Sequence, residues 1–175
     1  MRLNMFNLIV RTAALAGVLL ISGVSNAAEV YLQAQSFTKT LTLPATTTLP
    51  ERTVGVPMWG FATCDVDWAN CGTEPDAPGP QIDIDLATTE PFTIHLKNTL
   101  STPVSIVIPG QVGGGNLERS ADGRVRSFTH ETLGDGGTAD YTWSSLRPGT
   151  YLYQSGTHPS IQVPMGLYGA LVVTP

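Results

Sequence analysis

The chain has 175 residues, a formal net charge of −5 at pH 7 and 42% hydrophobic residues. After loss of an N-terminal segment this length fits one domain, and the apolar content is enough to build a core. The acidic balance argues against nucleic acid and anionic membrane surfaces as partners, because both carry negative charge.

The first 27 residues have the pattern of an export signal. Arg2 and Arg11 precede a continuously apolar run at 13–21, and Ser25-Asn26-Ala27 fits a signal-peptidase site before Ala28. The run is roughly ten residues long, whereas a membrane-spanning helix needs about 20. We therefore expect a signal peptide at 1–27, a periplasmic or extracellular protein, and no membrane anchor. An uncleaved N-terminal anchor is the alternative.

Strand patterns separated by Gly, Pro, Asn and Asp run through the rest of the chain, without a sustained helical period. The clearest alternation is at 82–86, where isoleucine and leucine point one way and Asp83 and Asp85 the other. We expect strands at 30–34, 37–43, 54–62, 82–86, 91–98, 104–108, 125–131, 138–143, 150–153 and 166–173, a long loop at 111–123, and no helix. This series predicts an all-β, Greek-key β-sandwich.

Cys64 and Cys71 are the only cysteines, and they flank a short polar stretch. In an oxidising compartment a local disulfide is the expected pairing. So small a ring would add about 2–3 kcal/mol of stability in the chain-entropy model. Metal-bound thiolates are the alternative, although no His or further Cys lies close by in the sequence.

Three segments resemble the first cupredoxin (plastocyanin-like) domain of laccase-like multicopper oxidases. They are PGPQIDIDLATTEPFTIHLKNTL at 78–100, STPVSIVIPGQ at 101–111 and PGTYLYQSGTHPSIQVPMGLYGALVV at 148–173. The resemblance implies a single cupredoxin-like domain at 28–175 with copper as cofactor. It also implies oxidoreductase activity in a complete protein, with further cupredoxin domains or another chain as partners.

The resemblance also implies where copper ligands would stand. Pro109 and Gln111 occupy the place of one histidine pair, Gln154 that of the next ligand, and His158 lies near the fourth. Cu(II) prefers imidazole, and an amide oxygen is a much weaker ligand. We therefore expect most copper ligands to be lost and this chain alone to be inactive as an oxidase. A non-catalytic binding or interaction domain is the alternative function.

His158 is the best remaining metal candidate, and His130 is the second, with Glu131 as a possible orienting partner. An exported metal-handling protein using both histidines is a third hypothesis. The structural alternatives are a hydrogen-bonded loop histidine and an edge-strand histidine. His95, between Thr93 and Lys97, is expected on a solvated face, as are Asp83 and Asp85.

A mononuclear blue-copper site is not expected. The spacing of Gln154, His158 and Met165 is similar to a small cupredoxin's ligand loop, but that loop holds no thiolate.

Overall fold

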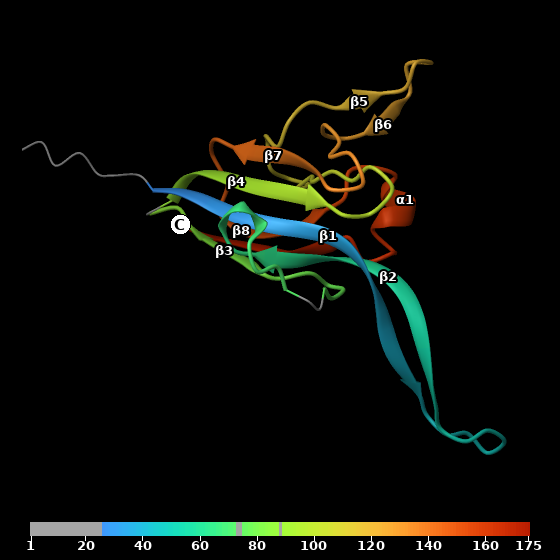
Figure 1. Cartoon of the computed structure of the whole chain (residues 1–175). Coiled ribbons are helices and arrows are strands. Elements are labelled where there is room, and N and C mark those ends of the chain that lie inside the picture. Colours follow the sequence, from blue (N-terminus) through green and yellow to red (C-terminus); the bar gives the residue numbers. More distant parts are fainter. Residues whose placement is uncertain (1–25, 73–74, 88) are drawn as a thin grey trace, which may run out of the picture.

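The computed structural model describes residues 26–72, 75–87 and 89–175, which form two packed sheets (Figure 1). The elements are β1 (Asn26–Leu43), β2 (Arg52–Cys64), the 3-10 turn η1 (Val66–Trp68), β3 (Ile82–Asp85), β4 (Thr89–Asn98), β5 (Glu118–Arg119), β6 (Val125–Ser127), β7 (Gly137–Trp143), β8 (Gly149–Gln154), α1 (Pro159–Gln162) and β9 (Tyr168–Thr174). One sheet has the order β2-β1-β4-β7, the second β3-β9-β8, and β5 and β6 form a small hairpin. The expected all-β sandwich is confirmed.

Alternating apolar residues build the core between the two sheets. Ile82 and Ile84 of β3 are buried while Asp83 and Asp85 are exposed, as their alternation predicts. Phe92 of β4 pairs with Trp143 of β7, and their rings stack with centroids 5.6 Å apart. The other large, fully buried side chains are Leu32, Phe61, Ile94, Leu96, Ile106, Ile108, Tyr141, Tyr153, Leu167 and Leu171. Burying each such side chain contributes about 1.5–3 kcal/mol.

The strands expected at 30–34 and 37–43 are one strand, β1, of 18 residues. It pairs with β2 from Tyr31 opposite Cys64 to Leu43 opposite Arg52 without interruption. Its parallel pairing with β4 ends earlier, at Ala34 opposite Asn98. The far part of β1 and the facing part of β2 therefore leave the sandwich as a long two-stranded ribbon (Figure 1).

Other boundaries differ from the expectation. Residues 104–108 are buried, except for the half-buried Val107, but form only two single bridges, to Thr132 and to Gln154, instead of a strand. The strand expected at 125–131 ends at Ser127, and β5 lies within the expected loop. The expectation of no helix is wrong, because α1 begins at Pro159, whose fixed φ suits a first helical position. Four residues are too few to show a helical period.

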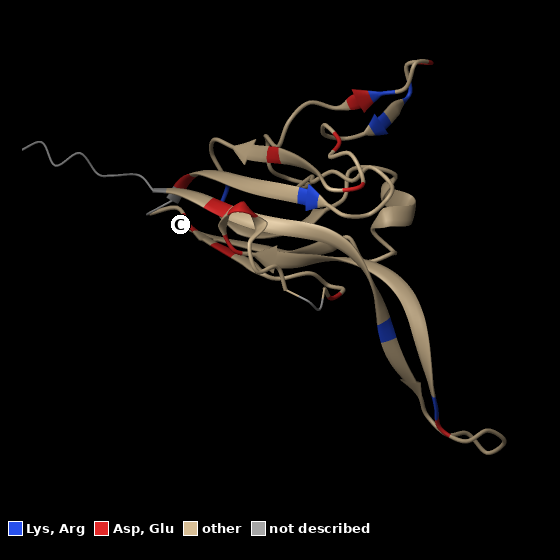
Figure 2. Ribbon diagram, viewed as in Figure 1, with Lys and Arg blue, Asp and Glu red and all other residues tan. Residues whose placement is uncertain are grey.

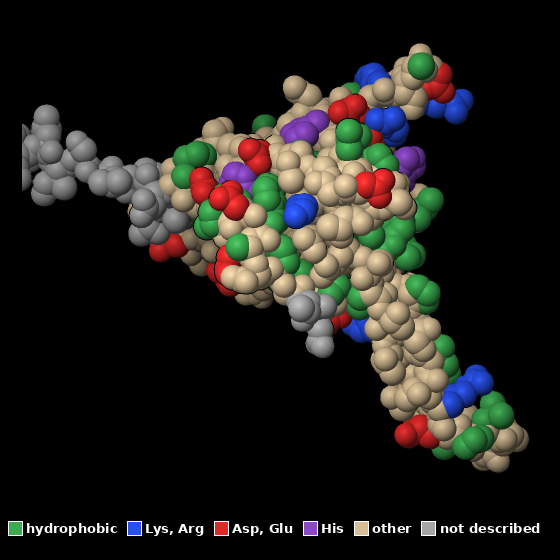
Figure 3. Space-filling model, in the orientation of Figure 1, with side chains coloured by type: hydrophobic (Ala, Val, Ile, Leu, Met, Phe, Trp, Pro, Cys, Tyr) green, Lys and Arg blue, Asp and Glu red, His purple; other side chains and the backbone are tan. Residues whose placement is uncertain are grey.

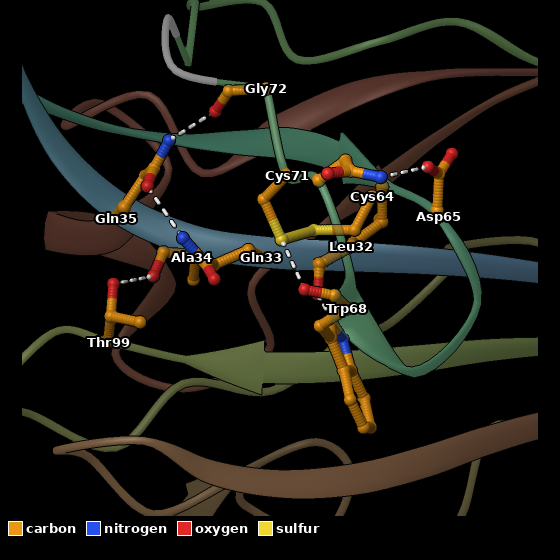
Figure 4. Close-up of a disulfide and its surroundings, with 11 residues drawn as sticks. Leu32, Gln33, Ala34, Gln35, Cys64, Asp65, Trp68, Cys71, Gly72 and Thr99 are labelled. Atoms are coloured by element: carbon orange, nitrogen blue, oxygen red, sulfur yellow. Dashed lines mark hydrogen bonds between the residues drawn. A yellow bond between two sulfur atoms is a disulfide. The ribbon is translucent and has the colours of Figure 1, made fainter.

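The disulfide is confirmed. Cys64 Sγ and Cys71 Sγ are 2.03 Å apart, so neither is available as a metal thiolate (Figure 4). The enclosed loop carries Trp68, whose Nε1 donates to the Leu32 carbonyl at 3.1 Å. The Trp68 ring also packs edge-on against Tyr31, with centroids 5.4 Å apart. The disulfide thus holds an aromatic cover on the outer face of β1.

His95 does not lie on a solvated face. Its ring stacks on Tyr31 with centroids 4.4 Å apart, and its Nδ1 is 2.7 Å from Asp140 Oδ1. Only 16% of the side chain is exposed. The alternation placed His95 correctly on the outer side of β4, but Tyr31 from β1 covers it there.

The expected signal peptide at 1–27 lies outside the described residues except for its last two, which are in β1. Within the described part of the chain, no helix has the length and apolar character needed to cross a membrane.

Candidate functional site

The end of β8, where the chain turns into α1, carries two of the implied ligand positions. Gln154 is the last residue of β8 and faces Val107 in a single antiparallel bridge. The two backbone hydrogen bonds of this bridge measure 2.8 and 2.9 Å. Gln154 is half-buried, and its position is fixed by main-chain pairing.

Pro109 and Gln111 are directed to the opposite end of β8. Pro109 is exposed, and a turn bond from Gln111 N to Ile108 O follows it. Both ends of the Gln111 amide bind the backbone of Arg147, which precedes β8, at 2.9 Å each. The structure therefore brings Val107, and not Pro109 or Gln111, to Gln154.

Three buried hydroxyls meet just beyond the end of β8. Ser105, Ser127 and Thr157, which we call the hydroxyl cluster, are each at most 1% exposed. Ser105 Oγ is 2.8 Å from Ser127 Oγ, and Thr157 Oγ1 lies 3.0 Å from the first and 3.1 Å from the second. The cluster joins three segments that are distant in the sequence.

A second layer of hydrogen bonds surrounds the cluster. Ser155 Oγ donates to Gln162 Oε1 at 2.6 Å, and Gln162 Nε2 donates to the Pro103 carbonyl at 2.8 Å. Thr129 Oγ1 donates to the Ile106 carbonyl at 2.8 Å. Because every one of these polar groups has a partner, their burial is compatible with a stable fold.

His158 lies just outside this network. It is exposed and has a left-handed backbone conformation, with φ of 41°, immediately before α1. It lines an open groove of about 370 Å³ together with Arg124, Arg126 and Phe128. The groove presents one imidazole and two guanidinium groups, and the guanidinium cations repel a metal ion.

His130 is held away from that groove. Its ring stacks on Tyr141, with centroids 4.4 Å apart and an interplanar angle of 7°. Glu131 does not orient it, because the Glu131 carboxylate, 3% exposed, contacts the Arg126 guanidinium. Gly115 leaves no room beside the ring, since a Cβ there would be 2.2 Å from His130 Nδ1.

The two candidate histidines are not brought into one site. Within residues 26–72, 75–87 and 89–175, no group of three or more His, Cys, Asp or Glu side chains is arranged to hold a metal. On the face shown in Figure 3, the histidine side chains are separated from one another.

Two fully buried tyrosines belong to the core. Burial raises the pKa of Tyr141, whose Oη lies 2.8 Å from Thr132 Oγ1 and donates to the His130 carbonyl. Burial also raises the pKa of Tyr153, whose hydroxyl donates to the Pro80 carbonyl at 2.6 Å. Both groups stay neutral at ordinary pH and serve the fold.

Sequence reasoning missed the hydroxyl cluster. One signal was present: Ser105 interrupts the apolar run 104–108, where a polar side chain must find a buried partner. The partners Ser127 and Thr157 come from 22 and 52 residues away, and no local pattern links them.

The family model for multicopper oxidases matches residues 64–175. The chain belongs to the multicopper oxidase family. A comparison with curated protein sequences found no match.

Solved structures of multicopper oxidases share the fold. A blue copper oxidase from Nitrosomonas europaea is 20% identical with a TM-score of 0.56, and 86% of this chain aligns with 39% of that one. For the laccase from Botrytis aclada the identity is 22%, the TM-score 0.54, and the coverage 86% and 23%. For a multi-copper oxidase from Pseudomonas thermotolerans the values are 18%, 0.51, 85% and 30%. The chain thus spans well under half the length of these multicopper oxidases.

The side chains at and near the implied ligand positions do not fit the copper that the family implies. Copper sites of this type need several imidazole or thiolate donors around one ion. Here both sulfurs are in the disulfide, Gln111 is bound to Arg147, and the hydroxyl cluster is closed on itself. His158 is the one imidazole in the described segment 148–173.

Proposed function

We propose that this chain is an exported cupredoxin domain of a multicopper oxidase-type protein that serves as a scaffold and does not itself assemble a copper site. The hydroxyl cluster is the observation that carries the proposal. Its hydroxyls, of which Thr157 lies just beyond Gln154 in the chain, hydrogen-bond one another, and among the described residues no group of three or more His, Cys, Asp or Glu side chains is arranged to hold a metal.

This chain aligns with only part of the length of the solved oxidases. That limited coverage supports the scaffold role. The domain aligns with 23 to 39% of their lengths, which leaves room in such proteins for further domains. In a complete protein, copper-dependent oxidation would then rest on ligands from other domains or another chain. The contribution of this domain would be to pack against them.

A second candidate function is a single-ligand contribution to copper held by a partner. It is favoured by the exposure of His158, for whose imidazole no hydrogen bond or ion pair is seen among the described residues. One imidazole binds Cu(II) weakly, so this function requires the partner to supply the other ligands.

Titration of the purified chain with Cu(II), followed by calorimetry and visible absorption, tests the proposal. We expect no tight site and no intense visible band, because no thiolate and no group of imidazoles is available. The variant His158→Ala removes the exposed ring, and His130→Ala, whose ring is stacked on Tyr141, is the matched control.

Weak binding that His158→Ala abolishes and His130→Ala preserves would support the second candidate. A tight site in the wild-type chain, with several histidine ligands, would overturn the proposal of a copper-free domain.

A further inference from the structure

The ribbon that projects from the sandwich lies outside the candidate functional site. We define the arm as residues 37–43 of β1, residues 52–58 of β2 and the connection between them. Seven cross-strand pairs, from Phe37 opposite Met58 to Leu43 opposite Arg52, hold it together. At about 3.3 Å per residue its strands extend for about 23 Å. In the part of the chain that the structure describes, no third strand pairs with it.

The register gives the arm two different faces. One face carries mainly apolar side chains, and the other is rich in threonine. The apolar face has Phe37, Met58, Val56, Leu41, Val54 and Leu43, together with Lys39 and Arg52, whereas the opposite face has Thr38, Thr40, Thr42, Thr53, Gly55 and Pro57. An isolated ribbon in water is not stabilised by having one apolar face. A ribbon whose apolar face is covered is stabilised by it.

The apolar face is open to solvent towards the tip. Leu41 is 44% exposed, Val54 40% and Leu49 of the connection 53%. Leu43 and Leu49 also line a hollow of about 260 Å³ at the tip, between Pro44 and Pro50. Figure 3 shows hydrophobic side chains along the outer end of the arm.

We expect another surface to pack on the apolar face of such an exposed ribbon. Two-stranded ribbons are marginally stable alone, and long open edges with apolar side chains invite pairing with another chain. Near its base the arm is fixed by Lys39, whose Nζ lies 2.8 Å from Asp76 Oδ1 and donates to the Ala77 carbonyl at 2.7 Å. The outer half has no such anchor among the described contacts.

We propose that the arm of a second copy of this chain covers it, apolar face against apolar face, with the two arms antiparallel about a twofold axis. The charges on the arm and beside its base are self-complementary in that arrangement. Glu51 and Arg52 are at the tip, and Lys39 pairs with Asp76 near the base. Figure 2 shows charges of both signs at the outer end of the arm. Antiparallel arms bring the tip of one to the base of the other, so Arg52 and Glu51 join the ion pair between the partner's Lys39 and the partner's Asp76.

The size of the arm sets the strength of the association. Two strands are about 10 Å across and the arm about 23 Å long, a smaller footprint than the roughly 800 Å² per partner of a standard stable interface. We therefore expect a reversible monomer–dimer equilibrium that depends on protein concentration and weakens as salt screens the tip-to-base charges.

Sedimentation velocity of the purified chain over a range of concentrations tests the proposal. The double variant Leu41→Lys/Val54→Lys changes a directly opposed pair on the apolar face. Its matched control, Thr42→Lys/Thr53→Lys, puts the same charges on the neighbouring opposed pair of the other face. We expect the wild-type chain and the control to dimerise, and the apolar-face variant to raise the dissociation constant at least about tenfold.

Cysteine trapping gives a second measurement that does not depend on added charge. Both native cysteines are in the disulfide, so Leu41→Cys and Thr42→Cys each introduce one free thiol. Oxidation should link Leu41→Cys into covalent dimers and leave Thr42→Cys largely monomeric. A wild-type chain that stays monomeric, equal loss of dimer in both lysine variants, or equal trapping at positions 41 and 42 would overturn the proposal. Each of these outcomes can occur whether or not the chain binds copper.

Discussion

The chemistry at the end of β8 is decided by individual residues. A histidine at position 154 would have offered an imidazole next to the β8–α1 turn, but Gln154 offers an amide. Ser105, Ser127 and Thr157 hydrogen-bond one another, and none of the three supplies the imidazole or thiolate that copper prefers. The loss of imidazoles at the ligand positions stays a prediction from the family resemblance, whereas the hydroxyl cluster emerged from the fold.

Removing a hydroxyl from the cluster should destabilise the domain. Thr157→Val keeps the shape of the side chain but leaves Ser105 and Ser127 one partner short, at a cost of about 1–3 kcal/mol in the free energy of unfolding. Thr150→Val, on an exposed position of β8, is the control and should change little. The measurement is urea unfolding of both variants, and equal stability of the two would show that the cluster contributes nothing.

The buried tyrosines predict a loss of stability in alkali. Burial raises the folded-state pKa of Tyr153, while the unfolded value is about 10. Below pH 10 the Tyr153 hydroxyl is neutral in both the folded and the unfolded chain, so its full contribution to the free energy of unfolding is present. As the pH rises above 10, the unfolded chain releases this proton more readily and the folded state loses stability. The fall in unfolding free energy between pH 9 and 11 should be smaller in Tyr153→Phe, and an unchanged fall would contradict this account.

At the scale of elements, short-range alternation was a good guide where a strand packs on one face. It placed β3, β4, β7, β8 and β9 within a few residues of their observed bounds. It failed where pairing with distant segments determines the secondary structure. Residues 104–108 are as apolar as a buried strand, but they form only single bridges, to Thr132 and to Gln154. It also split β1 at Ser36, since a single polar residue does not stop a backbone ladder that pairs continuously with β2.

The disulfide loop is an element whose contribution can be measured separately. The double variant Cys64→Ser/Cys71→Ser opens an eight-residue ring, which should lower the free energy of unfolding by about 2–3 kcal/mol in the chain-entropy model. The Trp68 ring should also lose its contact with Tyr31, and the Trp68 fluorescence emission should shift to the red as water reaches the indole. Reduction of the wild-type disulfide is the independent check. Unchanged stability and emission after both treatments would refute the role given to the loop.

For the whole molecule, the sequence predicted a cupredoxin-like sandwich fold and a multicopper oxidase relationship, and both are confirmed. What it could not predict is the projecting arm, since its two strands look like ordinary sheet strands until their neighbour β4 stops pairing at Asn98. Nor could it place His95 under Tyr31, because that contact depends on the parallel register of β1 and β4.

Export is a property of the whole chain that mass spectrometry can test. If residues 1–27 are a signal peptide, the protein recovered from the periplasm or medium should begin at Ala28. The variant Ala27→Arg should block processing by placing a large charged residue at the cleavage site. Recovery of an intact N-terminus from the wild-type chain would favour the uncleaved anchor instead.

The central claim is that this domain has the multicopper oxidase fold without a copper site of its own. Pulsed electron paramagnetic resonance of the Cu(II)-loaded chain tests it most directly, because the modulation of the signal counts the imidazole nitrogens bound to each copper. The account predicts at most one imidazole per copper, contributed by His158 and lost in His158→Ala. Three or more imidazoles on one tightly held copper would contradict it.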